Sequence, residues 1–103
     1  MAKGYWIAHV DITDPERYKD YVAANAEAFS KYGARFLVRA GQSETVEGQL
    51  DGRHVVIEFA DYATAKACYE SPEYQRAKAV RAEASTGRLI IIEGYDGPQP
   101  ETA

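Results

Sequence analysis

Cysteine is almost absent from this chain, because Cys68 is the only one among 103 residues. A single cysteine excludes an intrachain disulfide and a cysteine-based metal site, and such usage is typical of proteins from a reducing cytosol. No apolar run approaches the ~20 residues that a membrane-spanning helix needs. The formal net charge is −4, and no cluster of Lys or Arg could follow a phosphate backbone. We therefore expect a cytoplasmic protein that binds neither a membrane nor nucleic acid.

Motifs that mark common kinds of chemistry are missing as well. The chain has no glycine-rich phosphate loop, no G-x-S-x-G nucleophile motif and no HExxH zinc motif, so no organic cofactor is predicted. A metal site built from His9, Glu58 and Glu93 would contain one imidazole and no characteristic ligand spacing. No metal is predicted either.

The composition that remains is that of one folded domain. It is 46% hydrophobic and 27% charged, which is ordinary for a globular protein. We expect a single domain over residues 1–96. The segment 97–103 holds two prolines and otherwise small or polar residues, so we expect a frayed tail.

Turn and capping residues divide the domain into strands and helices. Asp14-Pro15 and Ser71-Pro72 each combine an N-cap with a proline suited to the first helical position, and Asp61 can cap another helix. Gly33 is the expected left-handed stop of the first helix, and Asp51-Gly52 is a turn dipeptide. The predicted strands cover residues 4–12, 34–40, 54–60 and 88–94, with a further extended stretch at 43–47. The predicted helices follow the caps Asp14, Asp61 and Ser71; the second runs to about Glu70 and the last ends near Ser85.

The order strand, helix, strand, strand, helix, strand is typical of the ferredoxin-like α+β fold, with the second helix broken at Ser71-Pro72. This fold is a four-stranded antiparallel sheet that carries its helices on one face, with the first and third strands in the centre. Alternation within the strands predicts one apolar face and one mixed face, where aliphatic residues accompany His9, Arg39, Glu58 and Glu93. So much aliphatic surface on the helix-free side predicts a second subunit or a ligand that covers it.

Several motifs resemble a known family. They are Gly-Tyr-Trp-Ile-Ala at 4–8, Asp-Ile-Thr-Asp-Pro-Glu at 11–16, Lys-Tyr-Gly-Ala-Arg-Phe-Leu-Val-Arg at 31–39, Val-Ile-Glu-Phe at 56–59 and Ser-Pro-Glu-Tyr-Gln at 71–75. Together they are similar to the small bacterial family catalogued as domain of unknown function 1330. The resemblance implies a subunit of a dimeric α/β-barrel, a homodimer whose two sheets pack through their helix-free faces. The wider superfamily includes cofactor-free monooxygenases, haem-degrading enzymes and isomerases, so the resemblance implies no particular reaction.

His9, Arg39 and Glu58 are the predicted catalytic residues. His9 lies mid-strand on the mixed face, where it could act as a general acid or base with Glu58 to orient it. A histidine buried at a dimer interface and hydrogen-bonded to the partner is the favoured interpretation of His9. Arg39 could hold a small anionic ligand, although an ion pair between Arg39 and Glu58 is the favoured interpretation. His54, at a strand start, is expected to face solvent.

Aromatic residues supply the predicted ligand-binding site. Trp6, Phe36, Tyr69 and Tyr74 could form the walls of an apolar cleft between sheet and helices. Helix-spaced tyrosines also commonly close the rim of a core, and this second interpretation is the stronger one. Cys68 lies on the apolar stripe of its helix and is expected to be an inert core thiol.

Two functions remain open from the sequence. The first is a homodimeric small-molecule-binding protein, in its catalytic form a cofactor-independent enzyme acting on a small, partly apolar substrate. The second is a non-catalytic dimeric module whose polar residues set the register of two sheets.

Overall fold

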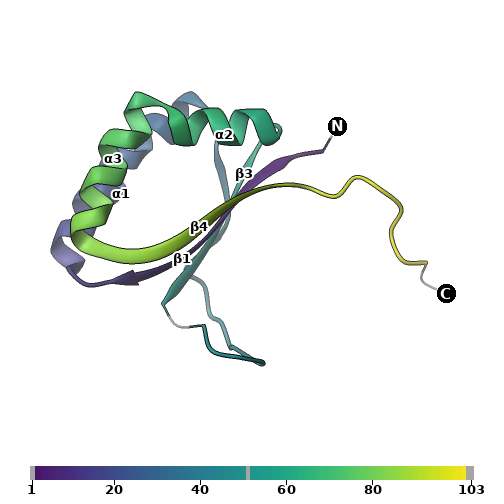
Figure 1. The fold of residues 1–103 in the computed structure, drawn as a ribbon, viewed down its shortest axis with the longest axis horizontal. Helices are drawn as coiled ribbons and strands as arrows, with labels where there is room; N and C mark the ends of the chain where they lie inside the picture. The colour runs from purple at the N-terminus through teal and green to yellow at the C-terminus, as the bar shows by residue number, and fades with distance from the viewer. Residues whose placement is uncertain (1, 51, 102–103) are drawn as a thin grey trace.

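The computed structural model describes residues 2–50 and 52–101 and arranges them in two layers, a sheet with all helices on one side (Figure 1). This confirms the predicted ferredoxin-like α+β fold. In chain order the elements are β1 (Gly4–Ile12), α1 (Pro15–Lys31), β2 (Arg35–Arg39), β3 (Arg53–Phe59), α2 (Tyr62–Glu70), α3 (Pro72–Ala84) and β4 (Ser85–Glu93).

The helices begin where the capping residues predict. The Asp14 carboxylate accepts from the Arg17 N–H at 3.1 Å, and the Asp61 carboxylate accepts from the Thr64 N–H at 2.7 Å. Ser71 has extended backbone angles and its hydroxyl caps α3. The extended residue before Pro72 ends α2 and lets α3 start in a new direction. None of the helices in the described part of the chain has the length and apolarity needed to span a bilayer.

The strands form one antiparallel sheet in the order β2-β3-β1-β4. The predicted central strands, β1 and β3, are therefore confirmed. On the helix-covered face, Trp6 of β1 lies between Ile57 of β3 and Ile91 of β4. Since side chains alternate along a strand, Tyr5, Ile7 and His9 point to the helix-free face.

A β-bulge in β2 overturns one prediction. Phe36 is opposite Ile57, Val38 is opposite Val56 and Arg39 is opposite Val55, so Leu37 is the extra residue. One extra residue reverses the facing of every side chain that follows it. Arg39 therefore lies on the helix side of the sheet, and its predicted place on the helix-free face beside Glu58 was wrong.

The other strands differ from prediction in smaller ways. β4 begins directly after α3 at Ser85, three residues before the predicted start. Glu93 is opposite Gly4, which lies on the same side of β1 as Trp6 and therefore on the helix side of the sheet. The prediction that Glu93 shares a face with His9 was wrong.

Residues 43–47 form no strand, and Asp51 of the predicted turn lies outside the described residues. Residues 97–101 adopt neither helix nor strand.

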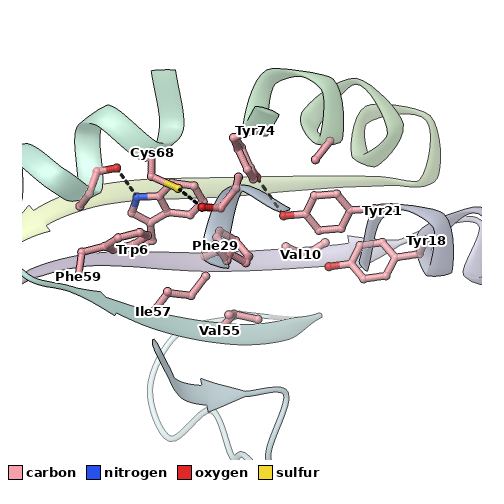
Figure 2. Close-up of a cluster of buried hydrophobic side chains, with 14 of the residues drawn as sticks. Trp6, Val10, Tyr18, Tyr21, Phe29, Val55, Ile57, Phe59, Cys68 and Tyr74 are labelled. Atoms are coloured by element: carbon pink, nitrogen blue, oxygen red, sulfur yellow. Dashed lines mark hydrogen bonds between the residues drawn. The ribbon is translucent and has the colours of Figure 1, made fainter. Parts of the chain in front are cut away.

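Trp6 is the centre of the core (Figure 2). Its side chain is 1% exposed, and its ring lies 4.8 to 5.8 Å from the rings of Phe29, Phe59, Tyr69 and Tyr74. The indole N–H donates to the Ala65 carbonyl at 2.8 Å, which satisfies both groups in a dry interior.

Cys68 lies in the same core, as predicted. Its side chain is fully buried, and burial raises the pKa of the thiol to about 12. Because the thiolate is the reactive form, a thiol with so high a pKa is poorly suited to nucleophilic chemistry.

Candidate functional site

A cavity of about 40 Å³ lies between the sheet and the helices α1 and α3. Both layers supply its apolar wall, which includes Trp6, Ala8, Val10, Phe29, Phe36 and Leu89. Pockets that take up small molecules combine such apolar walls with a few convergent polar groups. The cavity is therefore the first place to look for a binding site.

Three arginines line this cavity, one from each of β2, β3 and α3: Arg39, Arg53 and Arg81. Each guanidinium lies over an aromatic ring, an arrangement that holds the planar cation in place. The distances from guanidinium carbon to ring centroid are 4.1 Å for Arg39 over Phe36, 5.3 Å for Arg53 over Tyr18 and 5.9 Å for Arg81 over Tyr21.

Helix α1 contributes uncharged polar groups to the same cavity. Tyr18, Tyr21 and Asn25 follow one another at three- and four-residue spacing, all are buried, and all line the cavity. Figure 2 shows Tyr18 and Tyr21 in the layer between the helices and the strands, with the Tyr21 hydroxyl directed toward Tyr74. Burial raises the pKa of the Tyr18 phenol, whereas the positive charges of the three arginines act on that pKa in the opposite direction. Tyr18 is therefore a neutral hydrogen-bonding group at neutral pH.

The four predicted ligand-binding aromatics divide into two pairs. Trp6 and Phe36 line the cavity, whereas Tyr69 and Tyr74 are not among its lining residues. Tyr74 is fully buried, and its hydroxyl lies 2.9 Å from the hydroxyl of Tyr21. Burial raises its pKa far above the usual tyrosine value. Tyr74 thus supports the cavity wall from behind, and its binding role stays a prediction.

The predicted catalytic residue His9 lies on the other side of the sheet. Its partner is His54, directly opposite on β3, and the two Nδ1 atoms are 2.9 Å apart. At this distance one ring donates and the other accepts, so at least one of the two must be neutral. His54, expected to face solvent, is half-buried against His9 instead.

The structure does not bring together His9, Glu58 and Arg39. Glu58 is opposite Tyr5 of β1 and Arg35 of β2. Tyr5 and His9 are four residues apart on one strand, so Glu58 lies about 13 Å along the sheet from His9. Arg39 is on the opposite face. Their catalytic roles stay predictions, but Glu58 cannot orient His9 of the same protomer.

Within the described residues no group of three or more His, Cys, Asp or Glu side chains could hold a metal ion.

The family of the chain follows from its sequence. The family described as Domain of unknown function (DUF1330) matches residues 3–95. The chain belongs to this family. This confirms the resemblance carried by the motifs between residues 4 and 75. No curated protein matches the chain.

Solved structures similar to this DUF1330 chain share its fold at low sequence identity. A protein of unknown function from Rhodopseudomonas palustris is 16% identical with a TM-score of 0.74, and the match covers 93% of this chain and 85% of that one. SnoaB, a cofactor-independent oxygenase from Streptomyces nogalater, is 14% identical with a TM-score of 0.65 over 98% of this chain and 100% of that one. A dimeric ferredoxin-like protein of unknown function from Thermobifida fusca is 14% identical, with a TM-score of 0.58 and 89% of each chain covered.

Sequence analysis of this DUF1330 chain missed most of the polar groups in the cavity. Tyr18 and Asn25 lie on the inner stripe of α1, where they pass for core residues. Arg53 shares the parity of the buried Val55, and Arg81 lies seven residues after the buried Tyr74. The available signal was a charged residue at an inward-facing position on each of two elements, β3 and α3, which is uncommon without a partner.

The histidine pair predicts a measurable titration. Partial burial, followed by the positive charges of His54 and Arg88, lowers the pKa of His9 below its ordinary value. The pKa of His9 is therefore lower in the folded state than in the unfolded state. Neutral His9 makes its full contribution to the free energy of unfolding above the ordinary histidine pKa of about 6.5, and this contribution is lost as the pH falls through the lowered pKa. In an NMR titration of the ring Cε1 protons, we expect the His9 midpoint to lie below 6.5 and to rise in His54→Ala. A His9 midpoint unmoved by that substitution contradicts the pairing.

Proposed function

We propose that this protein is a homodimer that binds a small, partly apolar molecule in the cavity between its sheet and its helices. The proposal that it binds a small molecule rests on the cavity itself. Its apolar walls meet arginines from β2, β3 and α3 and uncharged polar side chains from α1. The single cysteine favours a reducing cytoplasm.

The helix-free face supports the dimeric half of the proposal. Leu37, Val38, Ile90 and Ile92 lie on this face or at its edge, and each is between 42% and 50% exposed. They belong to β2 and β4, the two edge strands, so exposed apolar surface is present at both edges of this face. Exposed apolar surface of this extent is typical of a protein interface. A second copy is the occupant we propose, because a twofold axis pairs identical patches and the similar protein from Thermobifida fusca is dimeric.

Replacing Ile90 with glutamate tests the interface. The carboxylate would be buried without a partner between two packed sheets, so we expect the dissociation constant to rise about 100-fold, equivalent to ~3 kcal/mol. Sedimentation equilibrium measures this change. Ala79→Glu places the same charge on the exposed surface of α3 and should leave the dimer unchanged. A wild-type chain that is monomeric at micromolar concentration, or equal effects of the two substitutions, refutes the proposed interface.

A cofactor-independent reaction on the bound molecule is the catalytic form of this proposal, and it is motivated by the fold shared with SnoaB. His9 is its proposed proton-transfer group. If His9→Ala remains folded and dimeric while turnover of a substrate panel is unchanged, His9 has no catalytic role.

One observation favours the alternative, a non-catalytic dimeric module. His9 is opposite both His54 and Arg88, so a polar row crosses an otherwise aliphatic face. Such a row can set the register of two sheets at some cost in stability. This alternative predicts that polar substitutions in the row shift the monomer–dimer balance, and that no small molecule binds in the cavity.

A further inference from the structure

We propose that the ligand of the cavity is a small organic acid with an apolar ring, whose carboxylate is bound by Arg39, Arg53 and Arg81. This inference rests on the binding function proposed above and names its ligand class. It adds a specific chemical demand, because a neutral molecule of the same shape should bind much less well.

The three arginines converge on one end of the cavity. The rings under Arg53 and Arg81 belong to Tyr18 and Tyr21, whose centroids are 5.3 Å apart. All three positive charges are near enough to act on the single Tyr18 phenol. Arg53 and Arg81 are partly buried, whereas Arg39 is exposed. Neighbouring cations repel one another, most strongly where water is excluded, so an anion placed among them relieves that repulsion.

No carboxylate of the described residues neutralises these cations. Arg17, on the outer side of α1, shows what a paired arginine looks like, with Glu83 at 2.8 Å and Asp20 at 2.9 Å. Arg39, Arg53 and Arg81 have no ion pair of this kind with any described residue. Asp11 and Arg53 line a shallow groove next to the cavity, but they form no ion pair with each other.

Arg53 carries the most specific signal. Its Nε atom is buried and finds no hydrogen-bond acceptor among the described residues. A buried donor without an acceptor is costly, and native structures rarely leave one without a reason. Arginine donates two parallel hydrogen bonds to a carboxylate, so a ligand carboxylate would satisfy this group. Asn25, 6% exposed and lining the same cavity, offers a further polar contact.

The rest of the cavity wall determines which kind of group the ligand carries beside its carboxylate. Trp6, Phe29 and Phe36 surround the space beside the arginines with aromatic surface, and the aliphatic Val10 and Leu89 complete it. Such a wall binds a ring by removing apolar area from water, and a bare anion would leave this surface unfilled. Charge and ring are therefore both required. Because the cavity measures only about 40 Å³, a ring enters it when lining side chains at the rim, such as the exposed Arg39, move outward.

Three probes separate these requirements: benzoate carries both features, benzamide the ring without the charge, and acetate the charge without the ring. Trp6 is the chain's only tryptophan and lines the cavity, so its fluorescence reports binding, with isothermal calorimetry as the second readout. We expect benzoate to bind at least ~10-fold more tightly than benzamide and acetate, because a charge-assisted bidentate contact is lost in the first and the apolar contact in the second.

The arginine variants decide which groups are responsible. Arg53→Met should reduce the preference for benzoate over benzamide to less than about twofold, and Arg53→Lys should retain part of it because the charge stays while the fork of donors is lost. Arg76→Met removes an exposed arginine of α3, paired with Glu27 at 3.6 Å, and should change nothing. Circular dichroism spectra and thermal unfolding of every variant identify any loss of fold.

Each contrary outcome has its own meaning. If benzamide binds as tightly as benzoate, the anionic class is wrong and the cavity still binds small molecules. If benzoate keeps its preference in a folded Arg53→Met, the carboxylate is held elsewhere and the inference is overturned. If none of the three probes binds, the inference fails, and sedimentation still decides the homodimer on its own.

Discussion

Replacing Trp6 with alanine is expected to lower the free energy of unfolding by about 3–5 kcal/mol. The indole fills the space between Phe29, Phe59, Tyr69 and Tyr74, and its removal opens a cavity that the rigid sheet and helices cannot close. The Ala65 carbonyl also loses the indole N–H as a donor. Since domains of this size are stable by only about 5–15 kcal/mol, this single substitution removes a large fraction of the total stability.

Urea denaturation followed by circular dichroism measures this loss. Trp6→Phe keeps one aromatic ring but lacks the N–H and the second ring of the indole, so we expect a smaller loss than for Trp6→Ala. The control is Tyr62→Ala, an equally aromatic position that is 41% exposed, for which we expect a change of less than ~1 kcal/mol. A Trp6→Ala variant as stable as Tyr62→Ala would show that the indole is not the centre of the core.

The fold could be predicted from sequence because its signals are local. Asp14, Asp61 and Ser71 each cap a helix through a hydrogen bond within three residues. The alternation of Trp6, Ala8 and Val10 with Ile7 and His9 needs only the period of one strand to assign a face. Such signals survive without knowledge of any distant contact, and the order of elements then leaves few topologies.

The site could not be predicted to the same degree because it depends on register and on one bulge. Parity indicated that His9 and Glu58 share a face, but only the pairing of β1 with β3 shows that His54 is the residue opposite His9. The extra residue Leu37 moves Arg39 across the sheet, and the alternating pattern of β2 carries no mark of it. Two residues predicted to act together are thus separated, and Arg39 instead joins Arg53, which was not predicted at all.

Filling the cavity from the sheet is expected to abolish ligand binding. Ala8 is 7% exposed, lines the cavity and lies between Val55 and Leu89 on the helix-covered face. A leucine here occupies the space that a ligand ring would need, so in Ala8→Leu we expect benzoate affinity to fall by about 100-fold or more, equivalent to ~3 kcal/mol. Calorimetry with benzoate measures the change. Overpacking should cost ~1–3 kcal/mol of stability, which thermal unfolding records separately.

Two controls make this experiment decide the side of the sheet on which the ligand lies. Ala26→Leu is the same substitution on the exposed surface of α1, and it should leave both stability and binding unchanged. Val38→Leu adds bulk on the helix-free face, where Val38 is opposite Val56. If binding survives in Ala8→Leu and is lost in Val38→Leu, the ligand lies between the two sheets of the dimer, and the arginines on the helix side serve a different purpose. If binding is lost only in Ala8→Leu, the cavity is the site, because no other substitution in the set removes space from it.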